Sequence, residues 1–260
     1  MNDKIKITAW FDDRFYKVDD EFYPSVTTIL NVAPKPFLAH WRGQVGNWEA
    51  NRIMEEAMQK GSNVHLAINT ILLGGQVVYE PKNEAKEREL HLSNNSKTIF
   101  LQNQQEQLES YRFLQFLELV KPKIILTEAI VFNTQYKYAG TLDLLMEINK
   151  GEYMIAGSKP LKLEHGIYIA DIKTGKQISN ENYCQLSAYS MCLDTKVIGG
   201  LVLHTNASTT KGIEGFQTHL RTADELENDF DKFLTYLKIY NFNPVEPKVF
   251  DLPQVLLLKK

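Results

Sequence analysis

Two short segments of the chain carry carboxylates inside runs of apolar, mostly branched residues. One is Leu142–Met146, which contains Asp143, and the other is Ile167–Lys173, which contains Asp171. Alternate side chains of a strand lie on one face, so Asp171 and Lys173 point the same way, roughly 6–7 Å apart. Two acids that bind a divalent cation, with an ammonium that orients a water, are what metal-dependent phosphodiester cleavage needs. The alternative is an exposed Asp–Lys ion pair at a strand end, which contributes little to the stability of the fold.

Asp143 lies in an otherwise apolar run, where an unpaired carboxylate is costly. It is therefore either a metal ligand or a structural acid whose oxygens accept backbone hydrogen bonds. Gly140, three positions earlier, lets another backbone or a substrate approach closely. Glu128 lies in the apolar run Ile124–Phe132 and is expected to face inward with its neighbours. It is either a further acid near the metal or a member of a structural ion pair.

Three more polar residues are candidates for the same site. His65 is expected in the first turn of a helix, where it is either a surface or core residue or a metal ligand through its neutral imidazole. Gln185 and Tyr189 are four positions apart on an expected helix Glu181–Leu193 and so share a face. Tyr189 is either a core aromatic or a phosphate contact.

The order of these motifs resembles the RecB-like branch of the PD-(D/E)XK nuclease superfamily. Gly61–His65 with the following apolar helix resembles that branch's histidine-bearing helix, and Tyr23–Leu30 with Trp41 resembles the start of phage exonucleases and of the mitochondrial genome maintenance exonuclease. The match covers residues 23–189, and its specificity comes from five loose motifs in the right order. The three central motifs are Gly140-Thr-Leu-Asp143, Asp171-Ile-Lys-Thr-Gly175 and Gln185-Leu-Ser-Ala-Tyr189.

The resemblance implies a metal-dependent deoxyribonuclease, most simply an exonuclease acting on single-stranded DNA or duplex ends in replication, recombination or repair. It implies Mg²⁺ or Mn²⁺ as cofactor, and a helicase or recombination protein is an expected partner. The residues it implies are the metal ligands His65, Asp143, Asp171 and the Ile172 carbonyl, the catalytic Lys173, and the supporting or DNA-contacting Gln185 and Tyr189. Two rivals are a catalytically inactive nucleic-acid-binding module of the same fold and a scaffold protein in which the acids are structural.

The chain departs from that branch in two respects. Asp143 and Asp171 are 28 positions apart, so an extended or flexible hairpin is expected over residues 149–166, where glycines and a proline recur. Lysines 150, 159 and 162 of this segment could reach phosphate. The iron-sulfur members of the branch have four cysteines, whereas this chain has only Cys184 and Cys192, so no such cluster is expected.

Bulk composition bounds the class of protein. The 260 residues are 43% hydrophobic and 23% charged, which is ordinary for a soluble globular protein. A net charge of −3 is not that of a general DNA-coating protein, so affinity for nucleic acid must come from local patches and bound metal. The cysteines, eight positions apart on a helix, are too distant for a disulfide. With no signal-peptide pattern and no membrane-spanning apolar run, we expect a cytoplasmic protein of a bacterial or phage-infected cell.

The expected fold class is α/β (α+β), a restriction-endonuclease-like core with a mixed central sheet flanked by helices. The order is helix, strand, strand, strand, helix, strand. Residues 1–260 are expected to form one domain, made of an N-terminal helical and hairpin addition (1–60), the nuclease core (61–220) and a C-terminal helix and tail (221–260).

Four local predictions follow from the pattern. Ser25 should cap a short helix over Val26–Asn31. A helix over Gln44–Lys60 should end at Gly61, with Ser62 capping a second helix. The stretch Thr98–Val120 should be one helix whose second half is amphipathic. The apolar patch Phe37–Trp41 should pack in the core, with a base-stacking surface as the alternative.

Overall fold

A five-stranded mixed sheet forms the centre of the computed structural model, which describes residues 6–10, 13–81, 98–156, 160–245 and 247. The strand order is β12-β11-β10-β7-β6. Only β10 and β11 are parallel, and the other neighbours are antiparallel. The strands are β6 (Lys123–Asn133), β7 (Tyr138–Ile148), β10 (Gly166–Lys173), β11 (Gly199–His204) and β12 (Gln217–Thr222).

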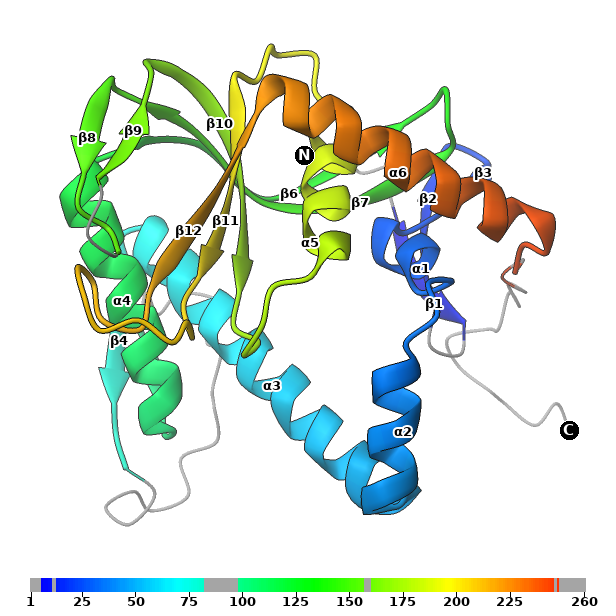
Figure 1. The fold of residues 1–260 in the computed structure, drawn as a ribbon, viewed down its shortest axis with the longest axis horizontal. Helices are drawn as coiled ribbons and strands as arrows, with labels where there is room; N and C mark the ends of the chain where they lie inside the picture. The colour runs from blue at the N-terminus through cyan, green and yellow to red at the C-terminus, as the bar shows by residue number, and fades with distance from the viewer. Residues whose placement is uncertain (1–5, 11–12, 82–97, 157–159, 246, 248–260) are drawn as a thin grey trace, which may run out of the picture.

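Helices cover both faces of this sheet (Figure 1). One face packs on α1 (Val26–Leu30), α5 (Asn180–Ser190) and α6 (Ala223–Phe242), and the other packs on α3 (Asn47–Leu72) and α4 (Gln104–Val120). The predicted mixed sheet with flanking helices is confirmed. The chain order of α4, β6, β7, β10, α5 and β11 matches the predicted order, with a small hairpin added between β7 and β10.

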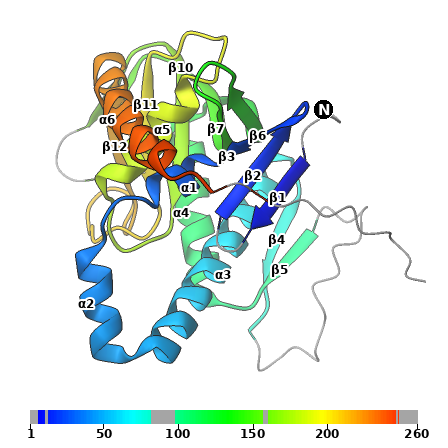
Figure 2. The ribbon, with the colours of Figure 1, turned by 90° about the vertical axis from the view of Figure 1, so that its right-hand side faces the viewer.

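The N-terminal residues form a separate three-stranded meander. Its strands are β1 (Lys6–Trp10), β2 (Asp13–Val18) and β3 (Glu21–Pro24), which lie beside the β6–β7 hairpin (Figure 2). The buried Tyr16 hydroxyl lies 3.0 Å from Thr141 Oγ1 of β7. Ser25 caps α1 as predicted, because its hydroxyl accepts a 3.0 Å hydrogen bond from the Thr28 N–H. The meander is thus tied to the strand that carries Asp143.

The predicted break at Gly61 is wrong, because α3 continues through it without interruption. Ser62 does not cap a helix; its hydroxyl donates to the Met58 carbonyl one turn earlier. A Cβ on Gly61 would lie 3.1 Å from Thr174 Oγ1, so the glycine lets α3 pass close to the loop after β10. Its small size serves packing between elements, which the sequence pattern alone does not distinguish from helix termination.

The amino-terminal part of the predicted helix Thr98–Val120 is also wrong. Thr98–Leu101 is a strand, β5, that pairs in parallel with β4 (Gln76–Tyr79). The helix α4 begins only after Asn103, whose side chain accepts a 2.8 Å hydrogen bond from the Gln105 N–H. A local cap therefore sets the start of the helix, and the apolar residues before it are buried against α3 instead.

The patch Phe37–Trp41 is not in the core. It belongs to the helix α2 (Pro36–Val45), which lies between α1 and α3 in the chain and has no buried residue. Phe37 itself is 82% exposed. In Figure 1, α2 and α3 meet in a V below the sheet, so α2 is held at its ends and by α3 rather than by the central core.

The insertion between β7 and β10 is a two-stranded hairpin of β8 (Gly151–Tyr153) and β9 (Leu161–Leu163), which confirms an extended hairpin. Lys150 and Lys162 are ion-paired with Glu164 and Glu152, at 2.8 and 2.9 Å. Lys159 and the predicted tail beyond residue 247 lie outside the described residues. Among the helices that the structure describes, none is long and apolar enough to cross a bilayer.

Candidate metal centre

The two central strands separate where their acids lie. The last residue pair between β7 and β10 is Leu144 with Ala170. Beyond it, the Ile172 N–H donates a 2.6 Å hydrogen bond to Asp143 Oδ2. The Asp143 side chain thus occupies the place where a backbone carbonyl would continue the ladder. This fork brings Asp143 next to the strand of Asp171 although 28 positions separate them in the sequence.

Glu128 approaches the same point from β6. Its neighbours Thr127 and Ala129 pair with Leu144 and Leu142, so Glu128 lies opposite Asp143. The Glu128 backbone has a φ of 47°, a left-handed conformation that is uncommon for a residue with a side chain. Two like charges directly opposite each other destabilise a sheet unless a cation lies between them.

The expected inward apolar face around Glu128 is wrong. A bulge between Ile124 and Leu126 shifts the register, and Leu126 and Ile130 are 39% and 38% exposed. The Glu128 side chain is itself partly exposed and points to the acids rather than into the apolar core. Bulge and left-handed backbone together set this direction, and neither is visible in the alternation of residue types.

His65 reaches the acids from α3. Its Nδ1 lies 3.5 Å from Glu128 Oε1 and 3.6 Å from Asp143 Oδ1, and its Nε2 lies 3.2 Å from the Ile172 carbonyl oxygen. One ligand atom each of His65, Glu128 and Asp143 lies within 4.8 Å of the others. Helix α3 and the hairpin of β6 and β7 therefore direct oxygen and imidazole nitrogen donors to one point.

Asp171 and Lys173 lie on one face of β10, as the alternation predicts. Lys173 Nζ is 2.7 Å from Asp171 Oδ2. The pair is not at an exposed strand end, because Asp171 is 1% exposed. Apart from this ion pair, neither carboxylate oxygen of Asp171 has a hydrogen-bond partner among the residues that the structure describes. A buried carboxylate with one ammonium partner and unused acceptor capacity is suited to a divalent cation.

Lys173 is held from α5 by the pair of residues predicted to share a face. Its Nζ donates a 2.9 Å hydrogen bond to Gln185 Oε1, and Gln185 Nε2 donates to the Tyr189 hydroxyl at 3.3 Å. Tyr189 is 4% exposed and belongs to the core beneath α5. A Cβ on Gly140 would lie 2.3 Å from the Tyr189 ring, so Gly140 admits this ring rather than a backbone or a substrate.

The acids determine the proton affinities in the site. Burial alone would lower the pKa of His65, but the carboxylates of Asp143, Glu128 and Asp171 outweigh it and raise that pKa to about 9. Burial, together with the charge of Asp171, raises the pKa of Asp143 above its ordinary range despite the opposing charges of His65 and Lys173. Burial raises the pKa of Tyr189 well above its usual value, so it stays a neutral phenol. Without metal, a protonated His65 balances the acids.

A cavity of about 850 Å³ opens in front of these residues. Its far wall comes from the N-terminal addition and includes hydroxyl groups and the exposed Arg14. The sequence predicts an N-terminal wall over the cleft, but not which of its side chains face the site. The only local signal is Thr141, which precedes Asp143 by two positions and bonds Tyr16. The wall residues are Arg14, Tyr16, Ser25, Thr27 and Thr141.

A buried polar network supports Lys173 from the opposite side. The Thr205 N–H donates to the Lys173 carbonyl at 3.0 Å, and the Thr205 hydroxyl donates to Glu109 Oε2 at 2.9 Å. Glu109 of α4 is fully buried and also pairs with Lys60 of α3. Helices α3 and α4 thereby fix the end of β10 on which Lys173 lies.

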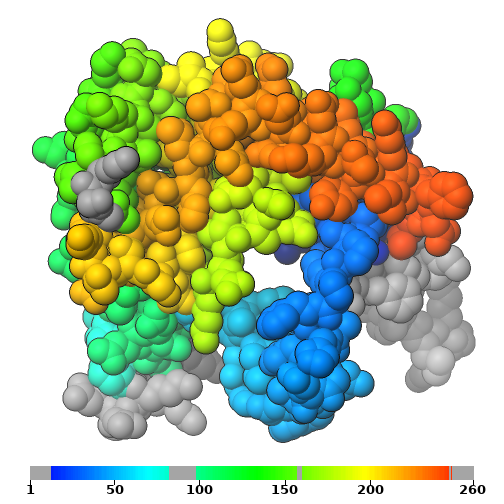
Figure 3. All heavy atoms as spheres, viewed as in Figure 1, coloured from blue at the N-terminus to red at the C-terminus, as the bar shows by residue number. Residues whose placement is uncertain are grey.

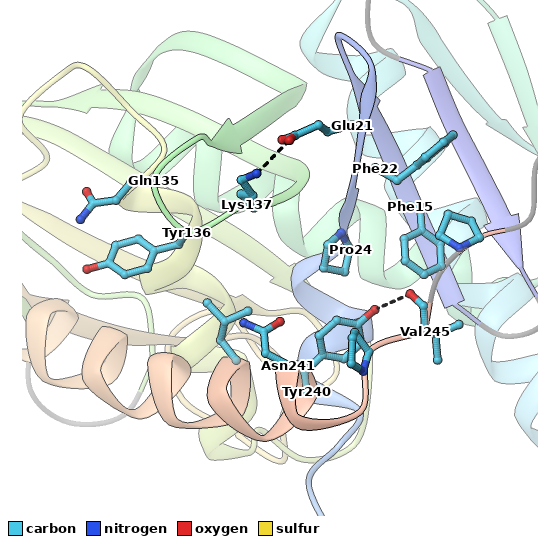
Figure 4. A pocket seen from close by; sticks show the side chains of 13 residues that line it. Phe15, Glu21, Phe22, Pro24, Gln135, Tyr136, Lys137, Tyr240, Asn241 and Val245 are labelled. Atoms are coloured by element: carbon cyan, nitrogen blue, oxygen red, sulfur yellow. Dashed lines mark hydrogen bonds and ion pairs between the residues drawn. The ribbon is translucent and has the colours of Figure 1, made fainter.

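Another cavity, of about 660 Å³, lies between the β2–β3 hairpin, the β6–β7 turn and the end of α6 (Figure 4). Some of its polar groups are already paired: Lys137 donates to Glu21 at 2.9 Å, and the Tyr240 hydroxyl donates to the Val245 carbonyl. No metal-binding group of described residues lies there, which leaves the His65 cluster as the candidate centre.

The donor set fits a hard divalent cation. Carboxylate and carbonyl oxygens suit Mg²⁺ and Mn²⁺, and one imidazole favours Mn²⁺ among the two. The buried Asp171 oxygens and the facing acids Glu128 and Asp143 carry negative charge that a bound cation would neutralise. A comparison with protein-family models and a comparison with curated proteins each found no match.

Proposed function

We propose that the protein is a metal-dependent deoxyribonuclease that acts as an exonuclease on DNA ends. The observation that carries the proposal is the fork between β7 and β10, which brings Asp143, Asp171 and Lys173 together at an open cavity. This is the arrangement implied by the resemblance to the RecB-like branch of the PD-(D/E)XK superfamily. The order of α4, β6, β7, β10, α5 and β11 also supports a restriction-endonuclease-like core.

The residues that would hold Mg²⁺ or Mn²⁺ are His65, Glu128, Asp143, Asp171 and the Ile172 carbonyl. The bound ion would neutralise charge on the scissile phosphate and make a water more acidic. Glu128 joins the set because its carboxylate faces Asp143 and His65, which favours the first of its two predicted roles. Oxygen ligands from two separated strands leave room for the phosphate on the cavity side.

Lys173 is the residue that would act on the attacking water and on the developing charge. Its ammonium is fixed between Asp171 and Gln185, so it does not have to reorganise during the reaction. Gln185 in turn is held by Tyr189, which acts as a positioning residue. Arg14, on the far wall of the cavity, would contact a phosphate of the bound strand.

The proposal is tested by digesting 5′- and 3′-end-labelled linear DNA, single- and double-stranded, and covalently closed circles, each with Mg²⁺ and with Mn²⁺. We expect short products from linear DNA and intact circles. Lys173→Ala should lower the rate by about 10²–10³-fold, as loss of a single transition-state donor does. Lys150→Ala is the matched control and should keep the wild-type rate, because Lys150 is paired with Glu164 and does not line the cavity of the metal centre.

Two outcomes would overturn the proposal. If the wild-type protein binds DNA but cleaves no substrate with either metal, the inactive binding module is the better account. If Lys173→Ala cleaves as fast as Lys150→Ala, the site is wrongly assigned. The expected helicase or recombination partner stays a prediction that pull-down with the folded wild-type chain would examine.

A further inference from the structure

A smaller cavity adjoins the candidate site. It measures about 470 Å³, and two of its lining residues, Thr27 and Gln185, also line the cavity of the metal centre. Gln185 is the residue that holds Lys173. A ligand that leaves the metal centre past Gln185 therefore enters this second cavity directly.

The second cavity has the chemistry of a base-binding surface. One part of its wall is apolar and includes two prolines and Phe37, whose side chain is not buried. The other part is polar and includes Ser179, Glu181 and Asn182. Lys35 stands beside it, with its ammonium 3.0 Å from Asn31 Oδ1 and otherwise exposed. An aromatic ring next to a flexible cation is how proteins hold a single strand without reading its sequence. The apolar lining residues are Leu30, Pro34, Pro36, Phe37 and Leu38.

The shape of the molecule gives a strand room to pass. The space-filling view shows an opening between the segment that contains α2 and the segment that contains α5 (Figure 3). The two cavities share Thr27 of α1 and Gln185 of α5. Phe37 at the start of α2 and Gln185 on α5 line the same cavity. A strand at the metal centre can therefore continue toward Phe37.

We propose that this cavity is a subsite for an unpaired nucleotide next to the scissile phosphate, with the Phe37 ring stacked on the base and Lys35 near a phosphate. The inference rests on the proposed nuclease function and adds a preference for single-stranded substrate. A base in a duplex is stacked between its neighbours and presents no free face to Phe37, so only an unpaired base gains this contact.

The test is binding of a fluorescein-labelled oligothymidylate, followed by anisotropy with Ca²⁺ in place of Mg²⁺, so that the acids are neutralised, and with the labelled strand checked to be uncut at the end. Phe37→Ala should weaken binding by about tenfold or more, as loss of one base–aromatic stack does, and Phe37→Trp should restore it. Phe242→Ala is the matched control, because Phe242 on α6 is 95% exposed and lines neither cavity. A series of oligonucleotides, each with one abasic site at a different position, then locates the contacted base. The wild-type protein and Phe37→Ala should bind equally well only to the oligonucleotide whose abasic site falls in the subsite.

Equal binding by Phe37→Ala and Phe242→Ala would overturn the subsite, even if the wild-type protein digests DNA. Weaker binding by Phe37→Ala at every abasic position would also overturn it, because the ring would then contact no particular base. Loss of binding confined to Phe37→Ala supports the subsite whether or not cleavage is found, so the two proposals fail separately. Because Phe37 is exposed, each variant should keep the fold, and thermal unfolding checks this.

Discussion

Glu128 is the residue whose role changes most once the strands are placed. Opposite Asp143 and 3.5 Å from His65, its carboxylate adds a negative charge that is unfavourable without a cation. The same charge would raise the affinity of the site for a divalent ion. The stability that the protein gains from a bound metal ion should therefore depend on Glu128.

We predict that Glu128→Gln gains less thermal stability from added Mn²⁺ than the wild-type protein does. The reason is that the amide removes one charged ligand of the ion. Thermal unfolding with EDTA and with a series of Mn²⁺ concentrations measures this gain for each protein. Glu147→Gln, on the same sheet but paired with Lys123, is the control and should keep the wild-type Mn²⁺ response. A Glu128→Gln protein with an unchanged Mn²⁺ response would remove Glu128 from the ligand set.

A pair of histidines on β11 and β12 gives a prediction about pH. Burial lowers the pKa of His219 below 6.5, and the charges of His204 and Arg221 lower it further. Its Nδ1 lies 3.3 Å from the Tyr183 hydroxyl, and its buried Nε2 has no partner among the described residues. The unfolded chain thus binds more protons than the folded one, so this histidine reduces stability as the pH falls through 6.5.

Urea unfolding at pH 7.5 and pH 5.5 measures this effect. The wild-type protein should lose more unfolding free energy between the two values than His219→Gln does. His40→Gln is the control, because His40 is exposed on α2. Acid sensitivity that is the same in His219→Gln and in the wild-type protein would show that His219 titrates normally in the folded state.

Among the elements, β7 depends on close contact with α5. Gly140 lies against the Tyr189 ring, and Tyr189 in turn holds Gln185. Any side chain at position 140 must displace the ring and with it the support of Lys173. Gly43 offers a contrast, because it lies within α2 and a Cβ there would meet nothing within 4 Å.

We predict opposite effects for the two alanine substitutions. Gly43→Ala should stabilise the protein by up to about 1 kcal/mol, since alanine favours helix over glycine. Gly140→Ala should destabilise it by roughly 1–3 kcal/mol, the usual cost of overpacking. Denaturant unfolding measures both, and the two variants make the same chemical change. A neutral or stabilising Gly140→Ala would mean that Tyr189 can move without cost and does not position the site.

At the scale of the whole molecule, the sequence predicts features that depend on neighbouring residues, but not features that depend on contacts between distant segments. The shared face of Asp171 and Lys173 and the Ser25 cap depend on alternation or on neighbours in the chain, and they are confirmed. The mixed sheet with helices on both faces follows from the order of these elements.

The remaining features depend on contacts between distant segments. Gly61 looks like a helix stop, yet it is small because Thr174 passes close to it. The direction of Glu128 depends on a bulge and on pairing with β7, and the cavity wall of Arg14 depends on how the N-terminal meander docks. Phe37 reads as a core residue by type, but α2 stands away from the sheet. Residue type and spacing carry no information on such docking.

The net charge of −3 makes the metal central to the whole molecule, because an acidic cluster would otherwise repel a phosphodiester. The most direct test is the rate of DNA cleavage as a function of Mn²⁺ concentration, for the wild-type protein and for Asp171→Asn shown to be folded by circular dichroism. We predict that the wild-type rate rises with Mn²⁺ and saturates, whereas Asp171→Asn shows no detectable turnover at any concentration. Cleavage by folded Asp171→Asn at the wild-type rate, or wild-type cleavage that persists in EDTA, would contradict the account.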